Sequence, residues 1–385
     1  MTRFSSRLFC RGFLSCSLQL TLALSWVQAA ADDFTVEDIV VSNPQVPLPD
    51  PEFDQIGSRM TWQDGQGNLW VTDVDPVTGL WTPPSGRQLQ LDTNLAPISW
   101  TGNGPEWAYA ADGSQIVYTK RDADNTMRLV RARRDVAGAW QVTELARGRS
   151  RFNPIGSKDV GDTQPRIAYF YTLYRDAMWR EVDASSTERD IPTPSQMQSS
   201  WVEGERALTI VSPDMNGVNQ CAEFNIDTQD VAPISWGSLP KRYGYVWRAP
   251  EYGNDKVAYC LEQSGSVLLI YRKLPEGWTK LKTMRPPSRA YFYSVEHFIY
   301  NGASYLVFLT QDISEGGGPA DVWIAGIDPV NGLLPHQVSS SANPTMVRMD
   351  PEVFITTQGP YVYYTEKTQP PDPETYITHR CATGL

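Results

Sequence analysis

Histidine is scarce in this sequence of 385 residues, and most familiar catalytic patterns are missing with it. The three histidines, His297, His336 and His379, are widely separated. There is no Gly-x-Ser-x-Gly nucleophile elbow, no His-Glu-x-x-His pair and no glycine-rich phosphate loop. These absences argue against a serine hydrolase, a zinc protease and a nucleotide-binding enzyme.

Cysteine is equally sparse. Two of the five cysteines lie within the first 16 residues, and the others are Cys221, Cys260 and Cys381. They form no Cys-x-x-Cys pair and no Cys/His cluster, which argues against a structural zinc site. Three thiols allow at most one disulfide. Cys221 and Cys260 fall in neighbouring repeats, described below, so they are either bridged or buried as two free thiols.

Only one segment is apolar over a long stretch, and it lies at the N-terminus. Three arginines precede the apolar run 12–27, and Ala29 ends a small-residue cleavage pattern. The run is shorter than the ~20 residues that a membrane-spanning helix needs. The pattern predicts a signal peptide over 1–29, cleaved near Ala29 to Ala31, and a mature domain over 32–385 with no membrane span. The predicted location is secreted or periplasmic.

Basic residues are in the minority. Without the predicted leader, 30 lysines and arginines face 44 acidic residues, a formal charge of −14. A chain of this charge repels phosphate backbones, so nucleic acid is not an expected partner. The acidic residues are spread along the chain rather than gathered in a tail. We expect a monomer with a solvated acidic surface.

Helical periodicity is absent as well, and alternation takes its place. No stretch of about 12 residues has apolar positions at helical spacing. The 29 prolines and 28 glycines leave little room for helices. Short β-rich runs that follow turn residues occur at 115–119, 166–170, 256–260, 305–308 and 361–364. The predicted fold class is all-β.

Two sequence segments recur along the chain. The letters APISW stand at 96–100 and again at 232–236, and DPVTGL at 75–80 returns as DPVNGL at 328–333, 253 residues later. Six repeats of about 42 residues would cover that distance, and this is the size of a four-stranded propeller blade. The repeats predict a single β-propeller.

The blades are counted from a third recurring feature, a Pro-Glu pair or a related sequence at the start of an innermost strand. It gives seven units that begin near residues 51, 105, 165, 201, 250, 295 and 351. The last unit is one strand short, and the segment 34–41 would complete it from the N-terminus and close the ring. Seven blades are predicted, with six as the alternative.

One repeat resembles a known family. The segment 105–119, PEWAYAADGSQIVYT, is similar to the WD-repeat-like unit of TolB-type propellers, which has a Ser-Pro-Asp-Gly turn between two strands. Ala110 and Ala111 replace the Ser-Pro of that turn, and the other repeats match faintly. The resemblance covers the propeller part only. It implies the fold and does not imply a role in the TolB system.

Glutamates at the predicted strand starts are the most suggestive candidate site. Glu52, Glu106, Glu251, Glu296 and Glu352 are expected to surround one mouth of the central channel. Carboxylates that converge there would raise one another's pKa, or bind Ca²⁺ or the basic side chain of a partner. Alternatively, each glutamate accepts backbone hydrogen bonds from the neighbouring blade and acts as a latch between blades.

The densest aromatic cluster outside the expected strands is the second candidate. Tyr243, Tyr245 and Trp247 stand between two arginines. They would either form a binding surface, including one for a glycan, or pack between blades.

Two weaker patterns complete the candidates. Asp122, Asp124 and Asn125 offer three oxygen ligands for Ca²⁺, although a hairpin turn explains them equally directly. No other cofactor is expected. Tyr293 and His297 near Arg289 could imitate the base and charge-neutralising groups of a polysaccharide lyase.

Together, these patterns predict an exported, non-enzymatic propeller that binds an extracellular or periplasmic protein or peptide at one face of the ring. A lyase or hydrolase acting on an extracellular glycan, or a propeller that only binds carbohydrate, is the alternative.

Overall fold

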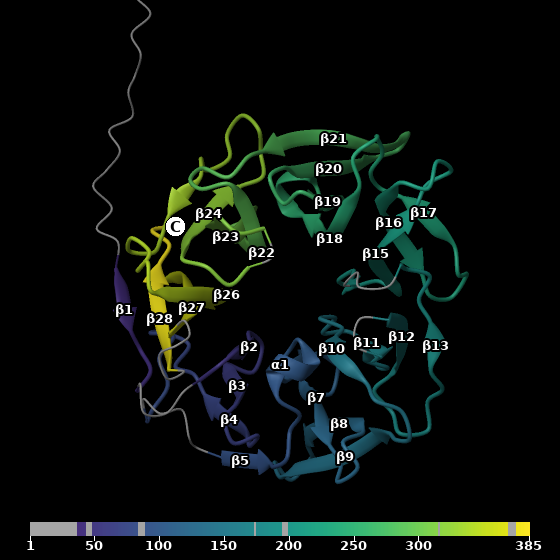
Figure 1. Ribbon diagram of the computed structural model, residues 1–385, viewed down its shortest axis with the longest axis vertical. Helices are drawn as coiled ribbons and strands as arrows, with labels where there is room; N and C mark the ends of the chain where they lie inside the picture. The colour runs from purple at the N-terminus through teal and green to yellow at the C-terminus, as the bar shows by residue number, and fades with distance from the viewer. Residues whose placement is uncertain are drawn as a thin grey trace, which may run out of the picture. The chain divides into compact units, whose positions relative to one another are not determined.

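The computed structural model describes residues 37–43, 48–83, 89–172, 175–194, 199–314, 316–368 and 375–385. The predicted signal peptide lies outside them. The described residues form seven four-stranded antiparallel sheets arranged as the blades of a ring (Figure 1). The predictions of an all-β fold and of seven blades are confirmed. No helix in the described part of the chain is long and apolar enough to cross a membrane.

Six blades each take four consecutive strands, ordered from the channel outwards. Blade 1 contains β2 (Glu52–Asp54), β3 (Arg59–Gln63), β4 (Leu69–Asp73) and β5 (Leu89–Asp92). Blade 2 contains β6 (Glu106–Ala108), β7 (Gln115–Arg121), β8 (Met127–Arg134) and β9 (Trp140–Ala146). Blade 3 contains β10 (Phe152–Gly156), β11 (Arg166–Thr172), β12 (Arg175–Glu181) and β13 (Arg189–Asp190).

Blades 4 to 6 continue the series. Blade 4 contains β14 (Ser200–Trp201), β15 (Ala207–Pro213), β16 (Asn219–Asn225) and β17 (Val231–Pro233). Blade 5 contains β18 (Lys241–Ala249), β19 (Asp255–Glu262), β20 (Leu268–Leu274) and β21 (Gly277–Met284). Blade 6 contains β22 (Tyr291–Tyr300), β23 (Ala303–Gln311), β24 (Ala320–Gly326) and β25 (His336–Gln337). Two short helices, α1 (Ile98–Thr101) and η1 (Pro250–Tyr252), lie between strands.

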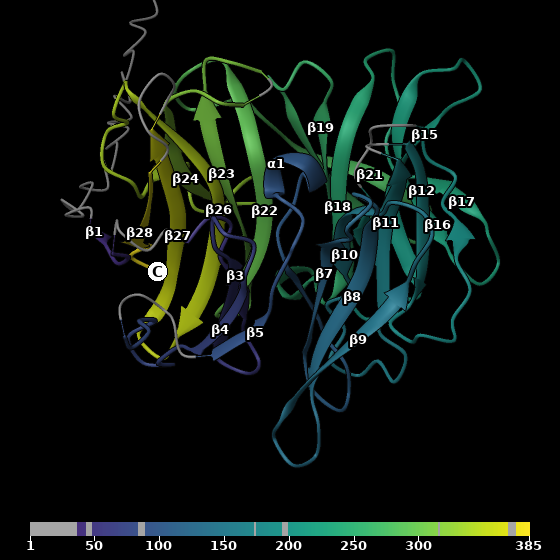
Figure 2. The same cartoon turned by 60° about the horizontal axis from the view of Figure 1, so that its bottom comes forward.

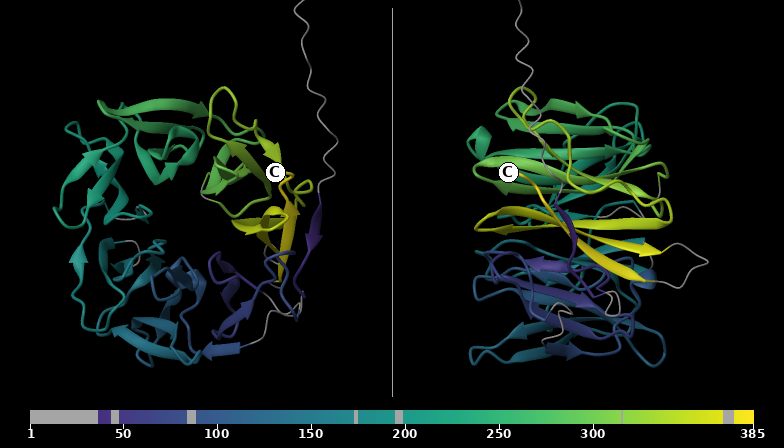
Figure 3. Two further views of the ribbon diagram at one scale, coloured as in Figure 1. Left: turned by 180° about the vertical axis from the view of Figure 1, so that it is seen from behind. Right: turned by 90° about the vertical axis from the view of Figure 1, so that its left-hand side faces the viewer.

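Blade 7 joins the two ends of the described chain. Its inner strands are β26 (Met346–Thr356), β27 (Gly359–Thr368) and β28 (Tyr376–Ala382), and β1 (Asp38–Val40) is the outer edge. β1 pairs antiparallel with β28, and Asp38 faces Cys381 (Figure 3). The prediction that an N-terminal strand closes the ring is confirmed.

Two of the seven predicted blade starts are wrong. Pro165 precedes β11, the second strand of blade 3, and Pro250 lies in η1 at the hairpin after β18. The innermost strand of blade 3 is β10, in which Asn153-Pro154-Ile155 occupies the place that Pro-Glu takes elsewhere. Proline also favours hairpin turns, so the pair alone does not identify an innermost strand.

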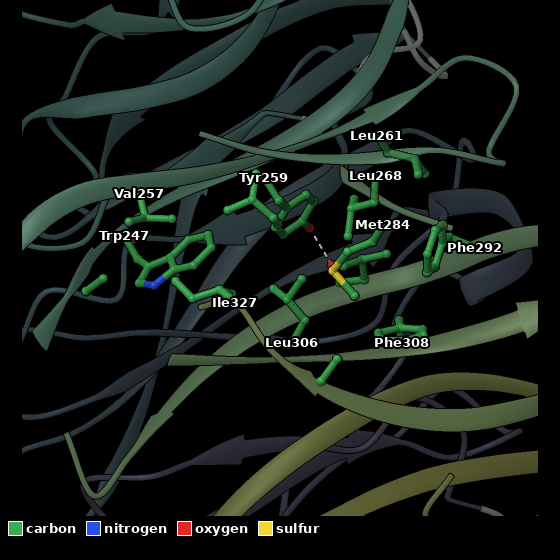
Figure 4. Packing of buried hydrophobic residues seen from close by; sticks show 14 residues of the cluster. Trp247, Val257, Tyr259, Leu261, Leu268, Met284, Phe292, Leu306, Phe308 and Ile327 are labelled. Carbon is green, nitrogen blue, oxygen red and sulfur yellow. Dashed lines mark hydrogen bonds between the residues drawn. The ribbon is translucent and has the colours of Figure 1, made fainter. Parts of the chain in front are cut away.

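The core is divided into seven apolar clusters, and each lies in the seam between two adjacent blades. In the seam between blades 5 and 6, Trp247 and Tyr259 pack with Phe292 and Phe308 (Figure 4). Buried tryptophans also bond across the seams: Trp107 Nε1 donates to the carbonyl of Glu52, 3.0 Å away. Each blade therefore depends on its two neighbours for burial.

The closing blade also contains a buried ionic network. Asp38 accepts hydrogen bonds from His379 Nδ1 (2.9 Å), Tyr364 Oη (2.9 Å) and the Ser340 backbone (2.7 Å). His379 Nε2 lies 3.4 Å from Glu366. Burial opposes the charged form of His379, but the hydrogen bonds to the two carboxylates raise its pKa to about 9. The imidazolium thus ties β28 to both β1 and β27.

We predict that closure weakens in mild alkali. A histidine whose pKa is raised by folding contributes stability that is complete below its unfolded pKa of about 6.5 and is lost as the pH rises through the folded value. His379→Gln should therefore be less stable than wild type at pH 6.5. The difference in unfolding free energy between wild type and His379→Gln should decrease by about 3 kcal/mol between pH 6.5 and 9.5. Urea titrations would measure it, and a gap independent of pH would contradict the prediction.

Candidate functional site

The innermost strands share a bend where they enter the channel. Four residues there adopt positive φ angles of 45–53° without being glycine: Asp50, Asn153, Ser294 and Asp350. The strand register shifts at this point in blades 3, 6 and 7. Such bulges re-aim side chains, and a non-glycine residue with positive φ costs on the order of 1 kcal/mol. Two residues after these positions come Glu52, Ile155, Glu296 and Glu352.

Six carboxyl groups on or directly before the innermost strands influence one another electrostatically, together with one lysine. Burial first, and then the charge of other members, raises the pKa of five of them. The six groups are Asp50, Glu52, Glu106, Glu296, Asp350 and Glu352, and the lysine is Lys158, whose Nζ lies 3.5 Å from Glu106. We call this group the channel carboxylate cluster. It comes from four consecutive blades (6, 7, 1 and 2), and Lys158 enters from blade 3.

Three members of the cluster lack hydrogen-bond donors. Asp50 accepts a hydrogen bond from the Gly104 amide (2.6 Å), Glu106 from Asn103 (2.7 Å) and Asp350 from Ser294 (3.4 Å). Within the described residues, none reaches Glu52, Glu296 or Glu352. Glu52 is nevertheless only 7% exposed, whereas Glu296 and Glu352 are half-buried. A buried carboxylate without donors is unfavourable, so Glu52 is the least satisfied of the three.

Burial and mutual repulsion hold protons on this cluster. Burial is the main reason that the pKa of Glu52 lies well above the ordinary value, and the charge of Glu106 adds to it. Burial likewise raises the pKa of Glu352 well above the ordinary value, and here the charge of Glu296 adds to it. The same two effects raise the pKa of Glu296 to about 7. At neutral pH the cluster therefore mixes protonated and ionised carboxyl groups, and it can exchange protons when its charge environment changes.

A cavity of about 830 Å³ adjoins the cluster. Its walls come from the β3–β4 loop, the segment before and within α1, the β7–β8 turn, and Met349, Lys367 and Tyr376 of the closing blade. α1 lies at the inner edge of the ring (Figures 1 and 2). Asp50 belongs both to the wall of this cavity and to the cluster. The cavity thus touches the cluster at Asp50, the one cluster member among its lining residues.

Four of the five predicted glutamates lie in the cluster, and Glu251 does not. Its carboxylate accepts hydrogen bonds from the Ser304 backbone (3.0 Å) and the Ser304 hydroxyl (2.9 Å). Ser304 lies in blade 6, whereas Glu251 lies in η1 of blade 5. Glu251 is therefore the inter-blade latch that was considered for all five residues.

The predicted aromatic surface belongs to β18, the innermost strand of blade 5, rather than to a loop. Trp247 is fully buried, and its Nε1 donates to Ser304 Oγ (3.1 Å). Tyr243 is half-buried against Tyr259. Tyr245 remains a site candidate, because its ring packs 5.2 Å from that of His297, the residue after Glu296, and burial and then the charge of Glu296 raise its pKa. The segment was misassigned because its glycine, Gly244, resembles a turn signal.

The three residues of the lyase interpretation occupy different environments. Arg289 pairs with Asp321 (2.9 Å) and Asp312 (2.8 Å). His297 stacks on Trp247 with ring centres 4.7 Å apart, and burial lowers its pKa to about 4. Tyr293 packs in the seam between blades 6 and 7. The three side chains therefore pack against different partners.

The candidate calcium ligands are engaged in a hairpin turn. Asp122 pairs with Arg128 (3.1 Å), Asp124 accepts a hydrogen bond from the Thr126 amide (3.0 Å), and Asn125 accepts one from Arg121 (2.7 Å). In the ranges that the structure describes, no group of three or more His, Cys, Asp or Glu residues is arranged to hold a metal ion.

Sequence reasoning missed part of the cluster. Asp50 and Asp350 could have been found by extending two of the Pro-Glu pairs one residue towards the N-terminus, to the Asp-Pro-Glu segments at 50–52 and 350–352. The same extension reveals Asn153-Pro154-Ile155 as the blade 3 copy. Nothing in the sequence marks Lys158, because its role depends on where blade 3 faces the other blades.

No family model matches the sequence, and no curated protein resembles it significantly. Solved structures share its fold. An oligogalacturonate lyase in complex with manganese is 13% identical over 90% of this chain and 93% of that chain, with a TM-score of 0.54. The Dos1 propeller (9% identity, 89% and 93% coverage, TM-score 0.48) and TolB from Acinetobacter baumannii (13%, 84% and 78%, 0.39) are also similar. At these identities the likeness shows the fold alone. The protein is a seven-bladed β-propeller.

We predict that the cluster destabilises the fold at neutral and higher pH. A carboxyl group whose pKa is raised by folding favours the folded state only while protonated, so its penalty grows as the pH rises from about 4.5 through about 7. Glu296→Gln should raise the unfolding free energy by about 1–3 kcal/mol at pH 8.5 and by much less at pH 4.5. Denaturant unfolding at both pH values tests this, and a loss of stability at pH 8.5 would refute it.

Glu251→Ala should behave in the opposite way. It leaves the Ser304 amide without its acceptor in the seam between blades 5 and 6. Loss of such a bond costs about 1–3 kcal/mol. The destabilisation should be similar at pH 6 and pH 8.5. A variant as stable as wild type in the same unfolding assay would show that Glu251 is not a latch.

Proposed function

We propose that this protein is an exported binding propeller that receives a basic side chain of a protein or peptide partner at the channel carboxylate cluster. The observation that carries the proposal is the set of three carboxyl groups of this cluster, Glu52, Glu296 and Glu352, for which the described chain supplies no hydrogen-bond donor. Among the described residues, Lys158 is the cation that lowers the pKa of all three. A second cation would therefore find an unfilled place.

A lysine or arginine side chain supplies what the cluster lacks. An ammonium or guanidinium group brings both positive charge and several N–H donors, and its hydrogen bonds to carboxylates are stronger than neutral ones. The adjoining cavity of about 830 Å³ falls within the usual size range of ligand sites and has room for neighbouring residues of a peptide.

The proposal is tested with defined peptides. Acetylated six-residue peptides of glycine and serine would carry arginine, lysine or the neutral isostere citrulline at the fourth position. Calorimetric titration of the full chain should detect the two basic peptides and not the citrulline peptide. Equal binding of all three would overturn the proposal, and so would an absence of binding by both basic peptides.

Matched variants locate the binding. The combined substitution Glu52→Gln, Glu296→Gln and Glu352→Gln keeps side-chain size and removes the charge, so it should abolish binding while the protein stays folded. Glu251→Gln, outside the cluster, should bind as wild type does.

The glycan interpretation is examined in parallel by incubating the protein with uronate polymers. Formation of unsaturated products would favour the lyase alternative.

Binding should also weaken in acid. A cation requires ionised carboxylates, and the pKa of Glu296 is about 7. As the pH falls from 8 to 5.5, protonation of this one group should lower the affinity for the arginine peptide by about 30-fold. Titrations at both pH values measure the ratio. In Glu296→Gln the dependence between these two pH values should become smaller, whereas an unchanged dependence would exclude Glu296 as the titrating group.

A further inference from the structure

Two buried cysteines face each other across the seam between blades 4 and 5. Cys221 lies in β16 and Cys260 in β19, and both are fully buried in the same apolar cluster. The third cysteine of the described chain, Cys381, lies in β28 of the closing blade. All three are free thiols in the structure. Only the first two are placed to meet.

Gly244 of β18 leaves open the space between them. A Cβ atom built on Gly244 would lie 2.9 Å from Cys221 Sγ and 3.6 Å from the Cα of Cys260. The Cys221 thiol therefore reaches the backbone of Cys260 across a position that has no side chain. Gly244 is also the register partner of Cys260, so this approach is built into the strand pairing.

The Cys221 thiol lies close enough to influence Cys260. Burial first, and then the neighbouring Cys221 thiol, raises the pKa of Cys260 well above its usual value. Cys221 Sγ also lies 3.7 Å from the carbonyl oxygen of Tyr243. A disulfide requires two β-carbons about 4 Å apart, and the experiment below tests whether docking of blades 4 and 5 brings the two cysteines to that distance.

We propose that Cys221 and Cys260 form an inter-blade disulfide when the protein folds in the presence of a small-molecule disulfide. One thiolate attacks the oxidant to give a mixed disulfide and releases the first reduced thiol. The second thiolate then attacks that mixed disulfide, forms the Cys221–Cys260 bond and releases the second reduced thiol. Two protein thiols are thereby oxidised, one disulfide of the oxidant is reduced to two thiols, and the protons pass to the solvent or to the released thiolates.

Burial determines when this reaction occurs. A thiol with a raised pKa and no exposure reacts slowly, because the thiolate is the nucleophile. The bond therefore forms while blades 4 and 5 dock, before the seam excludes the oxidant, and is protected from reduction afterwards. The bond would link β16 of blade 4 to β19 of blade 5. β19 pairs with β18, the innermost strand of blade 5, which contains Tyr245.

The experiment is oxidative refolding of the full chain. Reduced, denatured protein is refolded in a buffer of reduced and oxidised glutathione, the remaining thiols are alkylated, and the product is digested with trypsin. Cleavage after lysine and arginine releases Cys221 in the peptide 207–241 and Cys260 in 257–272. The expected result is a single species in which these two peptides are linked, while the peptide containing Cys381 is alkylated.

The controls separate a specific bond from general oxidation. Cys381→Ser should give the same linked species, whereas Cys221→Ser and Cys260→Ser should each lose it. The oxidised wild type should unfold about 5 °C higher than its reduced form, a difference absent from both single variants. Refolded protein in which both peptides are alkylated or carry glutathione would overturn the proposal, as would linkage of either peptide to Cys381.

Discussion

The structure depends on burial that no single blade can complete. A four-stranded sheet has two apolar faces, and here each face is covered only by the next blade, so the core is divided among seven seams. A row of blades would leave two faces exposed, and a ring leaves none. Closure of the last seam, where Phe53 and Trp62 of blade 1 pack with Phe354 and Tyr363 of blade 7, is therefore a condition for all the others.

Closure also creates the candidate site. Glu52 and Glu106 lie near the beginning of the propeller, and Glu296 and Glu352 lie near its end. They become neighbours only because blade 7 packs against blade 1. The channel carboxylate cluster thus spans the closing seam, and β1 secures that seam through Asp38 and His379. The packing of blade 7 against blade 1 therefore determines both the stability of the ring and which residues form the site.

The cluster works against the stability of the fold that holds it. Backbone bends with positive φ at Asp50 and Asp350 favour unfolding, and so do the like charges of Glu52, Glu296 and Glu352, which have no hydrogen-bond donors in the described chain. Glu251, by contrast, has the bonding expected of a structural residue, with two hydrogen bonds from one serine. The difference between these glutamates is why we assign binding to the cluster and stability to Glu251. Strain and unfavourable electrostatics that survive in a fold commonly mark functional positions.

The sequence by itself determined the all-β class, the seven blades and the closing N-terminal strand, because alternation and repeat length are local properties that each blade repeats. It also identified four glutamates of the cluster, since a Pro-Glu or Val-Glu pair recurs on the innermost strand of these blades. Only the tertiary structure distinguished Glu251 from them, placed Tyr243 to Trp247 in a strand and brought Lys158 to the carboxyl groups. Those outcomes depend on which blade faces which. That is a property of the closed ring, and no single repeat carries it.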